Sequence, residues 1–387
     1  MLQGNISNAP SGGEKASAND QTAAAAATGS FTLNGFDACS ALLAEDDPRP
    51  NWDTLQAIEA RRRNILEQVE LPVYRIMASW DGTCLQEMCV DSLVWMPVIV
   101  FFIVRLQAYI GIENPASFVE SMLDSSNIDI LGGFVAFLLV LFVNQTNERF
   151  WAMYQLSKRC CGLIQDTAGL VTNQLPSTSV ESKKLLRYMN AAHIAGYVGL
   201  GGPYSKQHFF NHLNQEHNLL NKEELAELEV YNMDAGSATF KTLCTWCQRE
   251  VVSARKAGHI DSYEAVQLQN RMLNFRAAMD GIYDFCEQPT QFFYIHFLIL
   301  ISTIYLPLFA VGLAYGSGWG DELNWKIDVI NGIVVVLQAI FVVGLRLLAQ
   351  KMIDPYGTDL EDLSVISYIY AGLDNSNIIM SVKSPID

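Results

Sequence analysis

The chain has 387 residues, of which 50% are hydrophobic and 17% are charged, whereas typical soluble domains carry about 25% charged residues. Its formal net charge of −16 argues against nucleic acid as a partner, because phosphate binding requires a basic surface. No P-loop, GxSxG or HExxH motif occurs, so the sequence contains no enzyme signature.

The amino-terminal part divides into two segments. Residues 1–50 are rich in Ala, Gly, Ser, Asn and Asp and have no basic stretch followed by an apolar core, so we expect a disordered tail and no secretory signal. Residues 51–89 predict a cytosolic helical segment. Its three consecutive arginines, Arg61, Arg62 and Arg63, indicate a solvated basic face beside a membrane.

The first apolar segment covers about residues 90–112 and contains Pro97, which membrane helices tolerate. The second covers residues 128–148. It is apolar from Ile130 to Val143 and then turns polar up to Arg149 without a helix breaker. Because about 20 helical residues cross a hydrocarbon core of about 30 Å, we interpret it as a membrane helix that faces protein or a pore.

Two more apolar segments follow a long polar region. Residues 150–288 are predicted to form cytosolic helices. Residues 292–315 and 329–348 are predicted to form the third and fourth membrane helices. Residues 350–387 form a cytosolic acidic turn and tail. These segments exclude the alternative that the second one is a buried helix of a soluble protein.

Charge asymmetry sets the orientation of four spans. The loop after the first span contains no Lys or Arg, and the loop after the third contains only Lys326. The opposite flanks are basic, with Arg61, Arg62, Arg63, Arg75, Arg149, Lys158, Arg159, Arg346 and Lys351. The positive-inside rule therefore places both termini and the long middle region on the cytoplasmic or equivalent side.

Large apolar side chains of the second span share overlapping helix faces: Phe134, Phe137, Leu138, Leu141 and Phe142. One such face, repeated by symmetry, would form a narrow apolar collar of the kind that gates channels by dewetting. Packing against the other spans explains each of these residues equally well at this point.

An acidic turn follows the fourth span, from Asp354 through Asp359 to Asp362. Pro355 and Gly357 predict a sharp turn. Carboxylates and freed backbone carbonyls are the ligands that calcium takes, although the residues by themselves favour a solvated acidic turn.

Four stretches together resemble one family, the bestrophins, which are pentameric anion channels. They are Trp80-Asp81-Gly82-Thr83, Arg149-Phe150-Trp151, Tyr283 to Pro289, and Ala349 to Gly357. They occur in the family's order, at the ends of four independently inferred spans, and the resemblance covers about Ile65 to Asp362.

The resemblance implies an all-α integral membrane protein with four transmembrane helices and a large cytosolic helical region, assembled as a homopentamer around a central pore in membrane lipids. Chloride or bicarbonate would permeate passively. The alternatives are a non-conducting membrane scaffold and, less favoured without an internal repeat or broken helices, a secondary transporter. The plasma membrane and an organellar membrane, such as the thylakoid membrane, both fit.

The resemblance also implies site residues. Phe137 and Leu141 are the preferred pore neck, with Phe134 and Leu138 in reserve, and Tyr263 corresponds to the cytosolic aperture. A calcium clasp would use the carboxylates of Asp359 and Asp362 and the backbone carbonyl of Asp354. Thr358 and Leu360 depart from the family's acidic run, but the resemblance reverses the preference at this turn towards a cation site.

Overall fold

The computed structural model describes residues 48–68, 72, 75, 83–111, 125–176, 179–288, 290–318 and 324–381. Residues Arg49–Asp387 form one compact unit. The expected disordered tail, apart from residues 48–50, and the loop that follows the first span, apart from residues 125–127, lie outside the described residues, as do Trp80, Asp81, Gly82 and Pro289.

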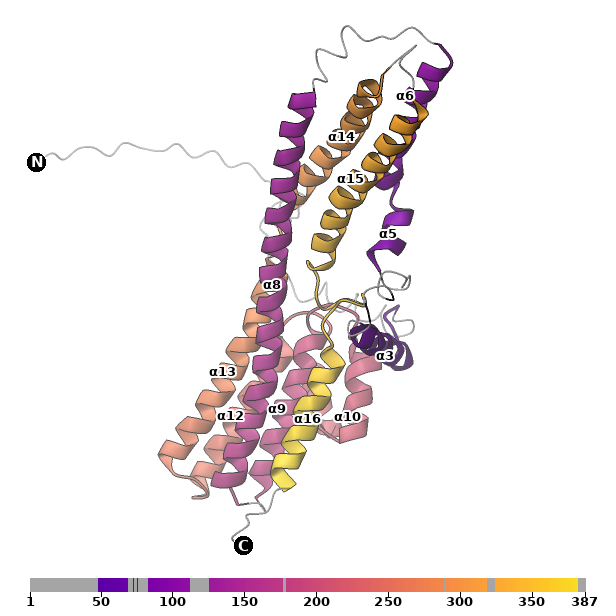
Figure 1. Cartoon of the computed structure of the whole chain (residues 1–387). Coiled ribbons are helices and arrows are strands. Elements are labelled where there is room, and N and C mark those ends of the chain that lie inside the picture. The colour runs from indigo at the N-terminus through magenta and orange to yellow at the C-terminus, as the bar shows by residue number, and fades with distance from the viewer. Residues whose placement is uncertain are drawn as a thin grey trace, which may run out of the picture. The chain divides into compact units, whose positions relative to one another are not determined.

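The described residues form an all-helical fold (Figure 1). In chain order the helices are α3 (Trp52–Gln68), α5 (Cys84–Val90), α6 (Ser92–Tyr109), α8 (Ser125–Gln174), α9 (Val180–Val198), the π-helical turn η1 (Lys206–Phe210), α10 (Asn211–His217), α11 (Lys222–Leu228), α12 (Ala238–Lys256), α13 (Ser262–Glu287), α14 (Phe292–Gly316), α15 (Trp325–Lys351) and α16 (Val365–Ser381).

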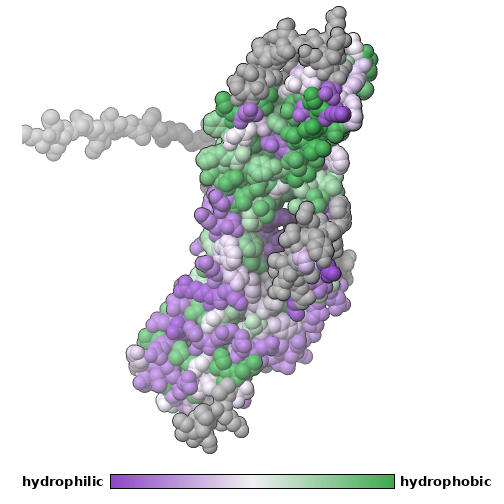
Figure 2. Space-filling model, viewed as in Figure 1, coloured by the Kyte–Doolittle hydropathy of each residue, from purple (hydrophilic) through white to green (hydrophobic). Residues whose placement is uncertain are grey.

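Within the described residues, four helices are long and apolar enough to cross a membrane, namely α6, α8, α14 and α15. They pack together as a membrane bundle, in which the first half of α8 contributes Val135 and Leu139 to a core shared with α14 and α15. Figure 2 shows hydrophobic side chains over this part of the surface and hydrophilic ones over the other end. The expected all-α membrane fold with four spans is therefore confirmed.

Helix α8 does not end where its apolar part ends. It continues for 50 residues, which is about 75 Å at about 1.5 Å per residue. Its second half packs with α9, α13 and α16, and α12 packs on α9 and α13 (Figure 1). We call these five helical segments the polar bundle. Thr146, in the middle of α8, satisfies its hydroxyl by donating to the carbonyl of Phe142 at 3.0 Å. One continuous helix thus connects the two bundles.

Local signals in the sequence explain where several helices begin. Asp261 caps α13 and Asn221 caps α11, each in a capping box completed by a glutamate three residues later. The capping box at Asn221 and Glu224 confirms the sequence-based expectation. These caps satisfy amide groups that the first turn of a helix leaves without partners.

Ion pairs between buried arginines and partly buried aspartates hold the membrane bundle at both of its ends. Arg105 of α6 pairs with Asp328 of α15 at 2.8 Å and donates to the carbonyl of Ala314 at 2.9 Å. At the other end Arg346 of α15 pairs with Asp91, the N-cap residue of α6. Pairing is required because an isolated charge at membrane depth is costly.

His193 lies fully buried in the polar bundle, between the rings of Tyr197 and Phe275. Burial lowers the pKa of this histidine to about 3, so it is neutral in the folded protein at neutral pH. The unfolded chain binds a proton there below about pH 6.5, and stability is therefore lost as the pH falls below that value.

We expect the melting temperature of detergent-purified protein to fall between neutral pH and pH values below 6.5, with His193 contributing at most about 1.4 kcal/mol per pH unit. His193→Phe should make this decline shallower. Parallel declines of the two proteins, followed by intrinsic fluorescence, would show that His193 does not carry the effect.

Candidate functional site

The first half of α8 has two opposite faces. One packs against α14 and α15, and the other is covered by no described part of the chain. Phe134, Phe137 and Leu141 lie on the uncovered face and are 61%, 60% and 43% exposed, whereas Phe142 on the packed face is 1% exposed. Spacings of three and four residues keep these three side chains on one stripe.

Among the four candidate neck residues, Leu138 differs from the others in its surroundings. Phe142 packs edge-on against the ring of Tyr294, with 5.6 Å between ring centroids. Leu138 is half-buried and packs with this cluster, and its carbonyl accepts a hydrogen bond from the Tyr294 hydroxyl at 3.3 Å. Phe137 and Leu141 therefore belong to the uncovered face together with Phe134, while Leu138 turns towards α14.

The uncovered face becomes polar one turn further along α8. Asn144, Gln145 and Glu148 are exposed and continue the stripe that begins at Phe134. A face that combines large apolar side chains with amides and a carboxylate suits neither lipid alone nor a dry helix contact. It suits a surface that borders water at one end and a narrow apolar passage at the other.

Arg149 lies at the junction of the two bundles. Its guanidinium donates to the carbonyl of Gln288 at 2.7 Å and to that of Phe285, and it lies 5.6 Å from the Phe285 ring centroid. An open cavity of about 730 Å³ here is lined by Arg149, Gln145, Glu148 and the first residues of α14. Sequence reasoning used Arg149 only as a family motif and a basic flank. Its place at the polar end of an apolar helix was the available signal for a site residue.

Tyr263 is the second residue of α13, beside its N-cap Asp261, and its side chain is 71% exposed. It lies in the polar bundle, at the end of α13 opposite to α14, and contacts none of the candidate neck residues. The structure therefore leaves Tyr263 available for an aperture but assembles none within one chain.

The acidic turn lies between α15 and α16. Asp354 accepts from the amide of Tyr356 at 3.3 Å, and Asp362 accepts from the amide of Asp359 at 2.7 Å. The carboxylate of Asp359 is exposed and lies 3.7 Å from the ammonium of Lys351. Burial raises the pKa of Asp362 to about 7, although the Asp359 amide and Arg62 both favour its charged form.

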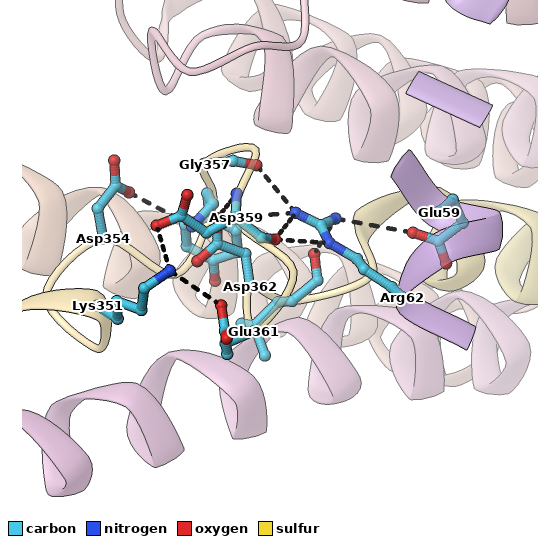
Figure 3. A network of polar contacts seen from close by, with 10 residues as sticks. Glu59, Arg62, Lys351, Asp354, Gly357, Asp359, Glu361 and Asp362 are labelled. Carbon is cyan, nitrogen blue, oxygen red and sulfur yellow. Dashed lines mark hydrogen bonds and ion pairs between the residues drawn. The ribbon is translucent and has the colours of Figure 1, made fainter. Parts of the chain in front are cut away.

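Arg62 reaches this turn from α3 (Figure 3). It is buried, while Arg61 and Arg63 are exposed, so the interpretation of all three arginines as a solvated face is wrong for Arg62. The reason is the helical period, which aligns Arg62 with the buried residues Leu55 and Glu59 of α3. The spacing of seven and three residues from these positions was the signal that sequence reasoning missed.

Tyr356 attaches the turn to α8. Its hydroxyl lies 2.8 Å from the hydroxyl of Ser157 and donates to the carbonyl of Met153 at 3.2 Å, and both partners belong to α8. The turn therefore touches α3 through Arg62 and α8 through Tyr356.

Comparison with known proteins identifies the family. The family model described as "Bestrophin, RFP-TM, chloride channel" matches residues 63–382. Bestrophin-2a of Homo sapiens is 23% identical over 235 residues, which cover 59% of this chain and 45% of that protein. The chain thus matches less than half the length of that relative.

Solved structures of a bacterial bestrophin homologue from Klebsiella pneumoniae share the fold. A point mutant of that protein has a TM-score of 0.62 at 15% identity, covering 75% of this chain and 98% of its own. A zinc-phased structure of the homologue has the same score and identity, covering 76% and 98%. At this identity the likeness concerns the fold alone.

The four long apolar helices define a multi-pass integral membrane protein, and the uncovered face of α8 is its candidate pore surface. Since the family model matches well over half of its length, the chain belongs to the bestrophin family. This is a family of chloride channels and not of enzymes, as the absence of catalytic motifs predicted.

Tyr356→Phe removes the hydroxyl that joins the turn to α8 and leaves the ring in place. We expect it to destabilise the protein by about 1 kcal/mol, the typical net contribution of a hydrogen bond. Thermal unfolding of purified protein measures this, with Tyr263→Phe as the control because that side chain is exposed. Equal losses for both variants would contradict the role given to Tyr356.

Proposed function

We propose that this chain is the subunit of a homopentameric anion channel, with chloride and bicarbonate as permeant ions. Ions pass by electrodiffusion along an axis lined by five copies of α8, and no covalent step is involved. The observation that carries this proposal is the uncovered stripe of α8, whose Phe134, Phe137 and Leu141 give way to amides at the polar end.

The neck follows from repeating this stripe around a five-fold axis. Phe137 and Leu141 form the constriction. Phe134 adds one more apolar ring and so lengthens the constriction along the axis. Gly133, exposed on the same side of α8, adds no side chain. An apolar ring of this kind passes ions when it is wetted and blocks them when it dries, because an unhydrated ion in an apolar passage is strongly disfavoured.

Positive charge near the cytosolic mouth supports anion selectivity. Arg149 lines the cavity there, and α14 begins in the same place, so that the positive end of its helix dipole faces the cavity. Glu148 lines it too and opposes this effect. Because Glu148 offsets the unit charge of Arg149, the positive end of the α14 dipole is the remaining contribution that favours anions.

Tyr263 forms the proposed second constriction, where five copies of the amino-terminal end of α13 approach the axis. Calcium control is a prediction from the resemblance alone. The geometry of the acidic turn supports a different cation there, the guanidinium of Arg62.

The proposed function is tested by recording currents from purified protein in planar bilayers under a KCl gradient. We expect a reversal potential close to the chloride equilibrium potential, since the cytosolic mouth favours anions. A reversal potential close to that of potassium would contradict anion selectivity. A pure, intact oligomer without current would favour the non-conducting scaffold.

A pair of cysteine variants tests which face of α8 borders the pore. Leu141→Cys should react with a negatively charged, water-soluble methanethiosulfonate and lose current, because Leu141 is on the uncovered face. Leu139→Cys is the matched control, since Leu139 is buried against α14 and α15. Protein of the native sequence, treated with the same reagent, controls for reaction at the native cysteines, of which Cys84 and Cys89 are exposed. Reaction at Leu139→Cys alone would place the pore on the other face.

A further inference from the structure

Backbone carbonyls of the acidic turn converge on the guanidinium of Arg62. Nε and Nη2 donate to the carbonyl of Asp359 at 2.9 and 2.7 Å, and Nη2 also donates to that of Gly357 at 3.2 Å. Nη1 donates to the carbonyl of Leu363 at 3.4 Å. Converging carbonyls of a tight turn repel one another unless a cation or donors lie between them, and Arg62 supplies both.

Two buried carboxylates complete the shell around this guanidinium (Figure 3). Glu59 lies 3.7 Å from Nη1, and Asp362 lies 3.7 Å from Nη2. Arg62, Glu59 and Asp362 are all buried. Carbonyls combined with carboxylates in a site closed to water are the oxygen ligands that a calcium ion collects, but here an arginine occupies their centre.

The carboxylates that the resemblance assigns to calcium do not fit such an ion. Asp359 directs an exposed carboxylate towards Lys351, while Asp362 uses one oxygen to cap the Asp359 amide. Within the part of the chain that the structure describes, no group of three His, Cys, Asp or Glu side chains is arranged to hold a metal ion. Two buried carboxylate oxygens of this shell lack a hydrogen-bond partner, one on Asp362 and one on Glu59, and two are far fewer than the six to eight oxygens of a calcium site.

We propose that the guanidinium of Arg62 is the resident cation of the acidic turn, so that a side chain of the chain itself performs the ordering role that the resemblance gives to calcium. The turn is then held permanently against α3. No divalent ion is needed to close it.

This site connects the amino-terminal helix to the pore helix. Arg62 joins α3 to the turn, and Tyr356, six residues before Asp362, joins the turn to Ser157 of α8. Ser367 at the start of α16 donates to Glu59 at 3.1 Å and closes the network from the other side. Because the cation is attached covalently to α3, it cannot dissociate when the ionic composition of the solution changes.

The test compares Arg62→Ala with Arg63→Ala, a matched control at an exposed position of the same helix. Thermal unfolding and equilibrium dialysis with radioactive calcium are performed on the purified full-length protein, in EGTA and in about 100 µM calcium. That concentration exceeds the dissociation constants of about 10⁻⁷–10⁻⁵ M that are typical of calcium sensors. Neither readout requires conduction, so the result is independent of the proposed channel function.

We expect native protein and Arg63→Ala to bind no calcium and to melt at the same temperature in both solutions. Arg62→Ala should melt roughly 5 °C or more lower, because two buried carboxylates and the turn lose their counter-charge. A low, non-denaturing concentration of guanidinium chloride should restore part of this loss, whereas the same concentration of urea should not. Arg62→Lys, which keeps the charge but not the planar fork, should lie between the two and remains informative if Arg62→Ala fails to fold.

Stoichiometric calcium binding to the native protein, with a higher melting temperature in calcium than in EGTA, would overturn the proposal. It is overturned as well if Arg62→Ala melts like Arg63→Ala, since the guanidinium would then not hold the turn.

Discussion

The backbone of a membrane span must satisfy all of its hydrogen bonds internally, and this constraint shapes the protein. Helix α8 meets it with one uninterrupted series of backbone hydrogen bonds over 50 residues. The helix runs from the membrane bundle into the polar bundle. The same helix supplies the candidate neck, the polar mouth beside Arg149 and the anchor for the acidic turn at Ser157.

Buried charge is handled in the same manner throughout the molecule. Three of its ion pairs, Arg105 with Asp328, Arg346 with Asp91 and Arg62 with Asp362, each bring together segments that are distant in the sequence. Breaking such a pair leaves an uncompensated charge in a place without water, which costs far more than an exposed ion pair contributes. These arginines therefore add specific contacts between helices that also pack through apolar clusters.

Much of the fold was predictable because its signals are local. Apolar runs long enough to cross a bilayer identified the four spans, and Asn221 with Glu224 predicted the start of α11. The extension of α8 beyond Arg149 was harder to predict, because the polar residues that suggested an exit from the membrane do not break a helix. The helix faces that carry Leu138 and Leu141 overlap, so apolar periodicity alone could not choose between these two residues, and only the resemblance favoured Leu141.

The sequence by itself determined the class of protein, the number of spans, the absence of catalytic motifs and the family resemblance, since hydrophobic length and motif order are properties of the chain alone. Only the tertiary structure decided which face of α8 stays uncovered, because that depends on where α14 and α15 pack. It also decided that Arg62, and not its neighbours Arg61 and Arg63, enters the acidic turn. Nearly 300 residues of chain separate α3 from that turn, and no local pattern encodes a contact that only the packing of the intervening helices brings about.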